Sequence, residues 1–310
     1  MTKEEFRDAA ITMLQDMIPA SMKVTVRPQE ITKANDQKLY GICFQREGSL
    51  SAPTYYVDDF FDLYLQGTPM QELMERLYKT YRAGPAVSPV LADAELPPYN
   101  KVKKQFTLRL LEKARNELFL ENVPYREVGN GLVLVCDISF FSEEDGIYKT
   151  TINQDIVDKE GYDVDRMFRD ALRNAPRIDP PRMMGNDLEP EDDVAEGVYK
   201  MLCLTTRSGS FGAAALFYPG MLRELEHIVE ESYFVLPVSL HELLILPQSA
   251  VEDPEFLISL APSANARIHP SEVLTDRILY YDRIAGELLT LTHALAAALR
   301  NGPVIDELVS

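Results

Sequence analysis

Basic residues are scarce in this 310-residue chain, which has 31 Lys and Arg against 49 Asp and Glu and a formal net charge of −18. A field of that sign repels phosphate groups, so the composition disfavours direct binding to nucleic acid or to an anionic membrane surface. Long apolar runs are also missing, since no stretch approaches the roughly 20 residues of a membrane span. The first residues, MTKEEF, include acids where a secretory signal is basic. We therefore expect a cytoplasmic protein with no membrane contact.

Cysteine and histidine are too few and too scattered for the common disulfide and metal motifs. The sequence has three cysteines, an odd number, at Cys43, Cys136 and Cys203. They lie far apart in apolar runs, which predicts buried free thiols. The four histidines are His227, His241, His269 and His293. None has the spacing that places two imidazoles around a zinc ion on one helix face. We therefore expect no metal and no other cofactor.

Nucleotide-binding and nucleophile motifs are absent as well. Residues 205–214, TTRSGSFGAA, could cradle a phosphate with backbone N–H groups and Arg207, but their spacing matches neither G-x-x-x-x-G-K-[ST] nor G-x-G-x-x-G. A hairpin turn is the favoured interpretation. The acidic runs at 143–145 and 189–193 lack calcium-loop spacing, so we expect solvated charge there. The sequence also lacks the G-x-S-x-G elbow that raises a serine nucleophile.

What the sequence does contain is an alternation of short strand pairs and amphipathic helices. Thr2 and Glu5 form a capping box at the start of the first helix. Hairpins are predicted over residues 39–57, 133–152, 201–217 and 278–291. Further helices are predicted over residues 58–67, 69–81, 101–120, 163–174 and 219–231. Antiparallel hairpins that alternate with packed helices indicate the α+β class.

Two of these segments share a plan of strand, turn, strand and helix. Gly48 and Gly209 occupy equivalent turns in residues 39–65 and 201–228, and residues 133–172 follow the plan more loosely. We interpret this similarity as a candidate structural repeat.

A composition change suggests how the chain is divided. Residues 175–197 are rich in proline and acid and have no hydrophobic periodicity, which predicts a linker or surface crossing. It would separate an N-terminal α+β half, 1–174, from a C-terminal α+β half, 198–310. The two halves can also pack as one domain.

The predicted helix at 101–120 is the most basic element of this acidic chain. Its cations are Lys101, Lys103, Lys104, Arg109, Lys113 and Arg115. A solvated helix face is the favoured interpretation. The alternative is a contact with an acidic surface, worth about 0 to 1 kcal/mol per exposed pair.

The order of these pieces resembles a family of bacterial proteins, found largely in clostridia, that is known only as a domain of unknown function. The matching stretches are LYGICFQREGSLSAPTYYVDDFFDLYLQG, VPYREVGNGLVLVCDIS, TINQDIVDKEGYDVDRMFRDALRNAPR, GAAALFYPGMLRELEHIVEESYFVLPVSLHELLILP and EVLTDRILYYDRIAGEL. They cover most of the chain in the family's order. The chain departs from the family at Val238, where that family has a small polar residue beside Ser239. The resemblance implies a bacterial, cytosolic setting and no particular chemistry.

The polar triplet Ser239, His241 and Glu242 interrupts the apolar stretch YFVLPVSLHELLILP at 233–247. In an extended chain Ser239 and His241 would share one face and Glu242 would lie on the other, so the three could not form a local catalytic triad. Pro237 favours a break between two strands, with the Ser239 hydroxyl bonded to the backbone of the bend. A structural polar cluster is therefore favoured over a catalytic one.

The leading hypothesis is a non-enzymatic module that binds another macromolecule, with a protein as the expected partner and no direct contact with nucleic acid. The alternative is a hydrolase-like enzyme centred on Ser239, His241 and Glu242, joined by Asp276 and Arg277 of the LTDR segment. A third hypothesis, based on charge alone, is an acidic decoy that occupies the nucleic-acid-binding surface of a partner.

Overall fold

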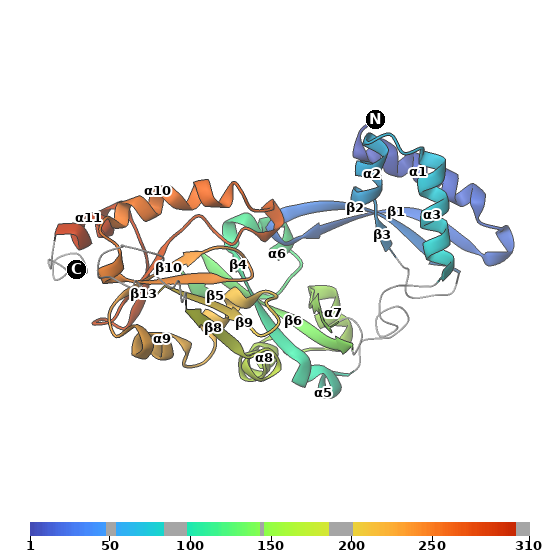
Figure 1. Cartoon of the computed structure of the whole chain (residues 1–310). Coiled ribbons are helices and arrows are strands. Elements are labelled where there is room, and N and C mark those ends of the chain that lie inside the picture. The colour runs from blue at the N-terminus through green and yellow to red at the C-terminus, as the bar shows by residue number, and fades with distance from the viewer. Residues whose placement is uncertain (48–53, 84–97, 143–145, 186–200, 302–310) are drawn as a thin grey trace. The chain divides into compact units, whose positions relative to one another are not determined.

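A computed structural model describes residues 1–47, 54–83, 98–142, 146–185 and 201–301. Helices and antiparallel sheets alternate along these residues, which confirms the predicted α+β class (Figure 1). The chain divides into two compact units, Met1–Pro98 and Tyr99–Ser310. This division does not coincide with the halves expected from the sequence, 1–174 and 198–310, which stay a prediction.

The described residues of the first unit combine three α-helices with a three-stranded antiparallel sheet. Its elements are α1 (Lys3–Met17), β1 (Val24–Lys33), β2 (Gln37–Arg46), β3 (Thr54–Tyr56), α2 (Asp58–Leu65) and α3 (Met70–Ala83). The strand order is β1-β2-β3. Both hydrogen bonds of the capping box predicted at Thr2 and Glu5 are present, and they begin α1. Phe6, Ile42 and Phe44 are fully or almost fully buried in the core between the helices and the sheet.

The second unit begins with a four-stranded antiparallel sheet of order β4-β6-β5, with β7 paired to the far end of β6. Its strands are β4 (Phe106–Glu112), β5 (Tyr125–Gly129), β6 (Leu132–Ser142) and β7 (Gly146–Thr151). The helices of this part are α5 (Tyr99–Val102), α6 (Glu117–Leu120), α7 (Gln154–Glu160) and α8 (Val164–Ile178). α8 begins at its Asp163 cap and packs against β4.

The prediction of a long basic helix at 101–120 is wrong. Phe106–Glu112 is strand β4, all seven of its residues are buried, and Arg109 pairs with the buried Asp137 of β6. Lys113 and Arg115 lie in a short 3-10 turn that follows the strand. These cations therefore do not share one solvated helix face.

The other sheet of the second unit has six antiparallel strands in the order β13-β12-β10-β11-β9-β8. The strands are β8 (Pro181–Gly185), β9 (Leu202–Thr206), β10 (Tyr233–Pro237), β11 (Leu243–Pro247), β12 (Leu279–Asp282) and β13 (Glu287–Thr290). The helices are α9 (Met221–Val229), α10 (Pro254–Asn265) and α11 (His293–Asn301). α9 and α10 lie on opposite sides of this sheet (Figure 1). Phe234 packs with the α10 side, whereas the neighbouring Tyr233 donates a hydrogen bond to a carbonyl of α9, because strand side chains alternate.

Two further expectations need correction. Residues 212–217 form a 3-10 turn, η5, instead of the second strand of a hairpin, and β9 pairs with β8 and β11. The proposed repeat is therefore not confirmed, and its Gly48 turn lies outside the described residues. The first part of the predicted linker is ordered structure, since α8 runs to Ile178 and β8 follows it. The rest of that segment lies outside the described residues.

The hairpins at 133–152 and 278–291 are confirmed as antiparallel pairs, as are the two strands predicted around the break at Pro237, 233–236 and 241–246, although the second of these begins at Leu243. β2 and β3 pair as predicted, although β1 was missed. None of the helices in the described part of the chain is long and apolar enough to span a membrane.

Candidate functional site

The polar triplet lies in the turn that joins β10 to β11. The backbone N–H groups of Val238 and Ser239 both donate to the Glu242 carbonyl oxygen at 3.2 Å. The Ser239 hydroxyl accepts the backbone N–H of His241 at 3.0 Å, and Ser239 is only 7% exposed. A serine hydroxyl bonded to the chain two residues ahead is a common way to fix a turn. The structure therefore places the Ser239 hydroxyl in a backbone contact.

The His241 imidazole contacts Phe211 and Glu272. Its Nδ1 accepts the backbone N–H of Phe211 at 3.0 Å, and its ring stacks on the Phe211 ring with centroids 5.3 Å apart. Its Nε2 lies 4.0 Å from the Glu272 carboxylate. None of the hydrogen bonds among the described residues joins the imidazole to Ser239. In this structure the imidazole and the Ser239 hydroxyl thus have separate hydrogen-bond partners.

Glu242 has a separate partner. The Cys203 thiol donates to its carboxylate at 3.6 Å. Burial raises the pKa of Cys203 to about 11, and the nearby Glu242 charge and this hydrogen bond add to the shift. The three cysteines are free thiols as predicted; Cys43 and Cys136 are buried and Cys203 is half-buried.

The loop at 205–214, one interpretation of which was a phosphate cradle, encloses a carboxylate of its own chain. Asp179, only 1% exposed, accepts the Ser208 N–H at 2.9 Å and the Ser208 hydroxyl at 2.5 Å. Thr206 and Lys149 also donate to it, at 3.0 Å and 3.1 Å. Desolvation acts to raise the pKa of Asp179, but the bonds from Ser208 and the charge of Lys149 outweigh it, and the pKa lies below its ordinary value.

A second buried ion pair adjoins this loop. The Arg109 guanidinium donates to one Asp137 carboxylate oxygen at 2.9 and 3.0 Å, and the Thr151 hydroxyl donates to the other at 2.8 Å. The same guanidinium lies 3.8 Å from the centroid of the Phe211 ring. Phe211, whose backbone is left-handed at φ 56°, thus contacts both Arg109 and His241. This polar network connects β4, β6 and β7 to the loop before η5.

Asp276 and Arg277, expected beside the triplet in the hydrolase hypothesis, have other partners. Asp276 accepts bonds from Arg115 and, at 2.6 Å, from the Asn265 amide. Arg277 lies 3.4 Å from the Glu112 carboxylate and donates to the Asn130 carbonyl at 3.0 Å. No hydrogen bond or ion pair within the described ranges joins either of them to Ser239, His241 or Glu242.

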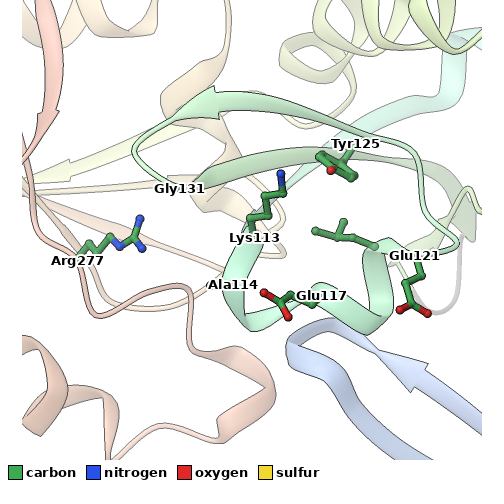
Figure 2. Close-up of a pocket in the computed structure, with 8 residues that line it drawn as sticks. Lys113, Ala114, Glu117, Glu121, Tyr125, Gly131 and Arg277 are labelled. Carbon is green, nitrogen blue, oxygen red and sulfur yellow. The ribbon is translucent and has the colours of Figure 1, made fainter.

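Arg277 instead lines a pocket of about 450 Å³ that lies wholly in the second unit (Figure 2). Its lining residues are Lys113, Ala114, Glu117, Leu120, Glu121, Tyr125, Gly131 and Arg277. The Arg277 side chain crosses Gly131, where a Cβ would collide with the guanidinium and where the backbone φ is +73°. Glycine at 131 is thus what allows Arg277 to reach the pocket.

The charged side chains that line this pocket differ in whether they have a counterion among the described residues. Lys113 donates to Glu127 at 2.6 Å and lies 5.2 Å from the Tyr125 ring centroid, while Arg277 is paired with Glu112. Glu117 and Glu121 are exposed, and neither carboxylate has a partner among the described residues. The uncompensated charge of the pocket is therefore negative.

Metal ligation finds no support in the part of the chain that the structure describes. No group of three or more His, Cys, Asp or Glu side chains there is arranged to hold a metal ion. His269 contacts Ser271, and His293 contacts Glu255. The acidic runs at 143–145 and 189–193 lie outside the described residues.

Sequence patterns predicted neither of two features of the structure. One is the polar network around Asp137 and Asp179, and the other is the Arg277 pocket. Each combines residues far apart in the chain, such as Lys149 with Asp179 or Lys113 with Arg277. The sequence contained only a weak signal for the network, which was the presence of the ionisable residues Arg109 and Asp137 inside otherwise apolar strands.

Comparison with known proteins identifies the family of the chain but gives no activity for it. No curated protein and no solved structure matches the chain. A family model does match over residues 3–283, which is most of its length. The chain therefore belongs to the family of unknown function DUF5688.

Proposed function

We propose that this protein is a non-enzymatic, cytoplasmic module that binds another protein and uses no cofactor. The observation that carries the proposal is the bonding of the Ser239 hydroxyl, which accepts a backbone N–H while His241 accepts another from Phe211. A serine nucleophile needs its base within hydrogen-bond reach of the hydroxyl. These bonds support a structural role for the Ser239 hydroxyl in the turn between β10 and β11.

The charge of the chain indicates the kind of partner. With a formal net charge of −18, the protein attracts cationic surfaces and repels anionic ones over a range set by the ionic strength. Complementary charge of this kind accelerates association and selects among partners. A protein with a basic surface is therefore the partner that the composition favours.

The two alternatives differ from this proposal in what they require. A hydrolase centred on Ser239 requires the turn to open, so that the hydroxyl leaves the His241 N–H and meets the imidazole. An acidic decoy requires a partner whose basic surface is one that binds nucleic acid. The geometry of the turn favours the binding module over the hydrolase, and the decoy is a special case of the binding module.

Quantitative affinity capture tests the proposal. The immobilised protein is exposed to a lysate of the organism that encodes it, at about 0.15 M salt and at about 1 M salt. We expect a defined partner with a basic surface that is retained at the lower salt, displaced by free protein and released at the higher salt. Retention of nothing beyond what an unrelated acidic protein of equal charge retains would contradict the proposal.

A further inference from the structure

The occupant of the Arg277 pocket can be inferred from how its charges are balanced. Both lining cations are already compensated, Lys113 by Glu127 and Arg277 by Glu112. Glu117 and Glu121 have no counterion among the described residues. An anionic ligand would be repelled by the two free carboxylates and would find both cations already paired. A cationic ligand would be attracted by the two free carboxylates. Charge complementarity therefore selects a cation.

The walls of the pocket narrow the choice of cation. Leu120 and Ala114 provide apolar surface, and Tyr125 provides an aromatic ring that is 38% exposed. The Lys113 ammonium lies 5.2 Å from the centroid of this ring, which is within the range of a cation–π contact. A ligand with an apolar stem and a charged head fits such walls better than a compact inorganic cation, because the stem can cover apolar surface while the head stays near the carboxylates.

Arg277 gives the pocket a fixed donor. Its Nε faces Glu112 and its Nη1 donates to the Asn130 carbonyl, so the guanidinium is held in one orientation across Gly131. Figure 2 shows this side chain at the Gly131 side of the pocket and Glu117 and Glu121 on the segment that follows Lys113. A peptide could place a backbone carbonyl oxygen toward the Arg277 side and a basic side chain toward the carboxylates.

We propose that this pocket binds a basic side chain, with arginine as the best fit, presented by the protein partner. The assignment rests on the proposed function for the identity of the partner, but the chemistry of the pocket can be tested without it. Arginine is preferred to lysine because its planar guanidinium stacks on aromatic rings and pairs with carboxylates in two directions.

The test uses the intact protein and Nα-acetyl-arginine-N-methylamide as the probe, followed by NMR of the backbone amides. We expect saturable shifts at Gly131 and Tyr125. The uncharged citrulline analogue should give no such shifts. The E117Q/E121Q double variant should weaken probe binding about fivefold at low salt, since each exposed pair contributes little alone. The E224Q/E230Q variant, which makes the same charge change on and beside α9, away from the pocket, should bind like the parent protein.

Three results would overturn the assignment: no shifts at the pocket with the arginine probe, equal shifts with the citrulline analogue, or stronger binding of Nα-acetyl-glutamate-N-methylamide. Thermal melting of each variant shows whether it is folded, and Y125L provides a second route if the carboxylate variant is not. Failure of the probe in a protein that still captures a partner contradicts the pocket alone. Probe binding that depends on Glu117 and Glu121 in a protein that captures nothing contradicts the proposed function alone.

Discussion

Asp179 is held by donors from the loop before η5 and from two neighbouring strands. It receives bonds from Ser208, Thr206 and Lys149, and Lys149 in turn donates to the Ser210 carbonyl at 2.7 Å. Lys149 and Asp179 are both almost completely buried. A buried ion of this kind is tolerated only when its partner is present and the remaining polar atoms are satisfied.

Replacement of Asp179 by asparagine should therefore destabilise the protein by about 3 kcal/mol at neutral pH, because it leaves the Lys149 charge buried without its partner. The folded-state pKa of Asp179 lies below the ordinary value of 3.8, so the carboxylate contributes its stability above that pH and loses it as the pH falls through the lowered pKa. Urea unfolding of parent and variant across the acid range measures this. The control is D158N, a change at an exposed carboxylate that accepts only from Gln154.

The difference between parent and D179N should shrink as the solution becomes more acidic than the ordinary carboxyl pKa. A difference that stays constant down to the lowest pH at which the parent remains folded would contradict the role given to this carboxylate.

Cys203 gives a second prediction for a single residue. Its pKa of about 11 reflects burial first and the Glu242 charge second, so the thiol stays protonated and unreactive at neutral pH. E242Q removes the charge and should speed alkylation of Cys203 by iodoacetamide about threefold to tenfold at about pH 9. Mass spectrometry of the Cys203 peptide measures the rate. The matched variant E287Q, at an exposed position of β13, should leave the rate unchanged.

At the scale of elements, two glycines are needed for different reasons where β9 leads into η5: Gly209 in the loop between them and Gly212 at the first position of η5. Gly209 has a left-handed backbone at φ +68° and open space around it. A Cβ at Gly212 would collide with the Thr205 hydroxyl and would lie 2.5 Å from the His241 carbonyl and 2.6 Å from the Thr206 nitrogen. Gly209 is thus required because of its backbone conformation, and Gly212 is required because no space is left for a side chain.

G209A should therefore cost about 1 kcal/mol, the ordinary strain of an alanine in a left-handed conformation. G212A should cost about 3 kcal/mol or more, because backbone atoms of β9 and of the β10 to β11 turn would have to move. Chemical denaturation of the two variants provides the comparison. Equal costs at the two positions would show that the close packing of this loop is misassigned.

Sequence patterns predicted the elements that have one solvated face or a defined cap. The Thr2 capping box and α8 behind Asp163 are examples, and Pro237 separately marked the break between β10 and β11. The patterns failed for β4, because a strand buried on both faces has no alternation and its apolar spacing also fits a helix. They also failed for β1, since Pro28 argues against a central strand, whereas β1 is an edge strand that tolerates it.

The candidate sites were predictable only where they are local in sequence. The bond from Ser239 to the backbone of its own turn involves neighbouring residues, and Pro237 indicated it. The Arg277 pocket depends on tertiary contacts that bring the turn at Asn130 against Arg277 and against Leu288 of β13, and no pattern in a single sequence encodes such contacts. Arg277 was selected from the sequence, but for a different site.

At the scale of the whole molecule, charge remains the property that most restricts possible partners. With a formal net charge of −18, the protein should not bind a generic DNA duplex detectably at about 0.15 M salt, where the screening length is ~8 Å. Fluorescence anisotropy with a labelled duplex checks this. A micromolar complex under those conditions would require a basic surface that the composition does not favour.

Whether the protein is a binding module or a hydrolase depends most directly on the Ser239 hydroxyl. We would measure the unfolding free energy and the labelling by a serine-directed fluorophosphonate on the same samples of the parent, S239A and H241A. S249A controls for a nearby exposed hydroxyl, which donates to Glu231 at 2.7 Å. We predict no labelling of the parent and a loss of roughly 1 to 3 kcal/mol in S239A, because the partly buried His241 N–H loses its acceptor. Labelling of the parent that disappears in both S239A and H241A, with unfolding free energy unchanged, would contradict the binding-module account.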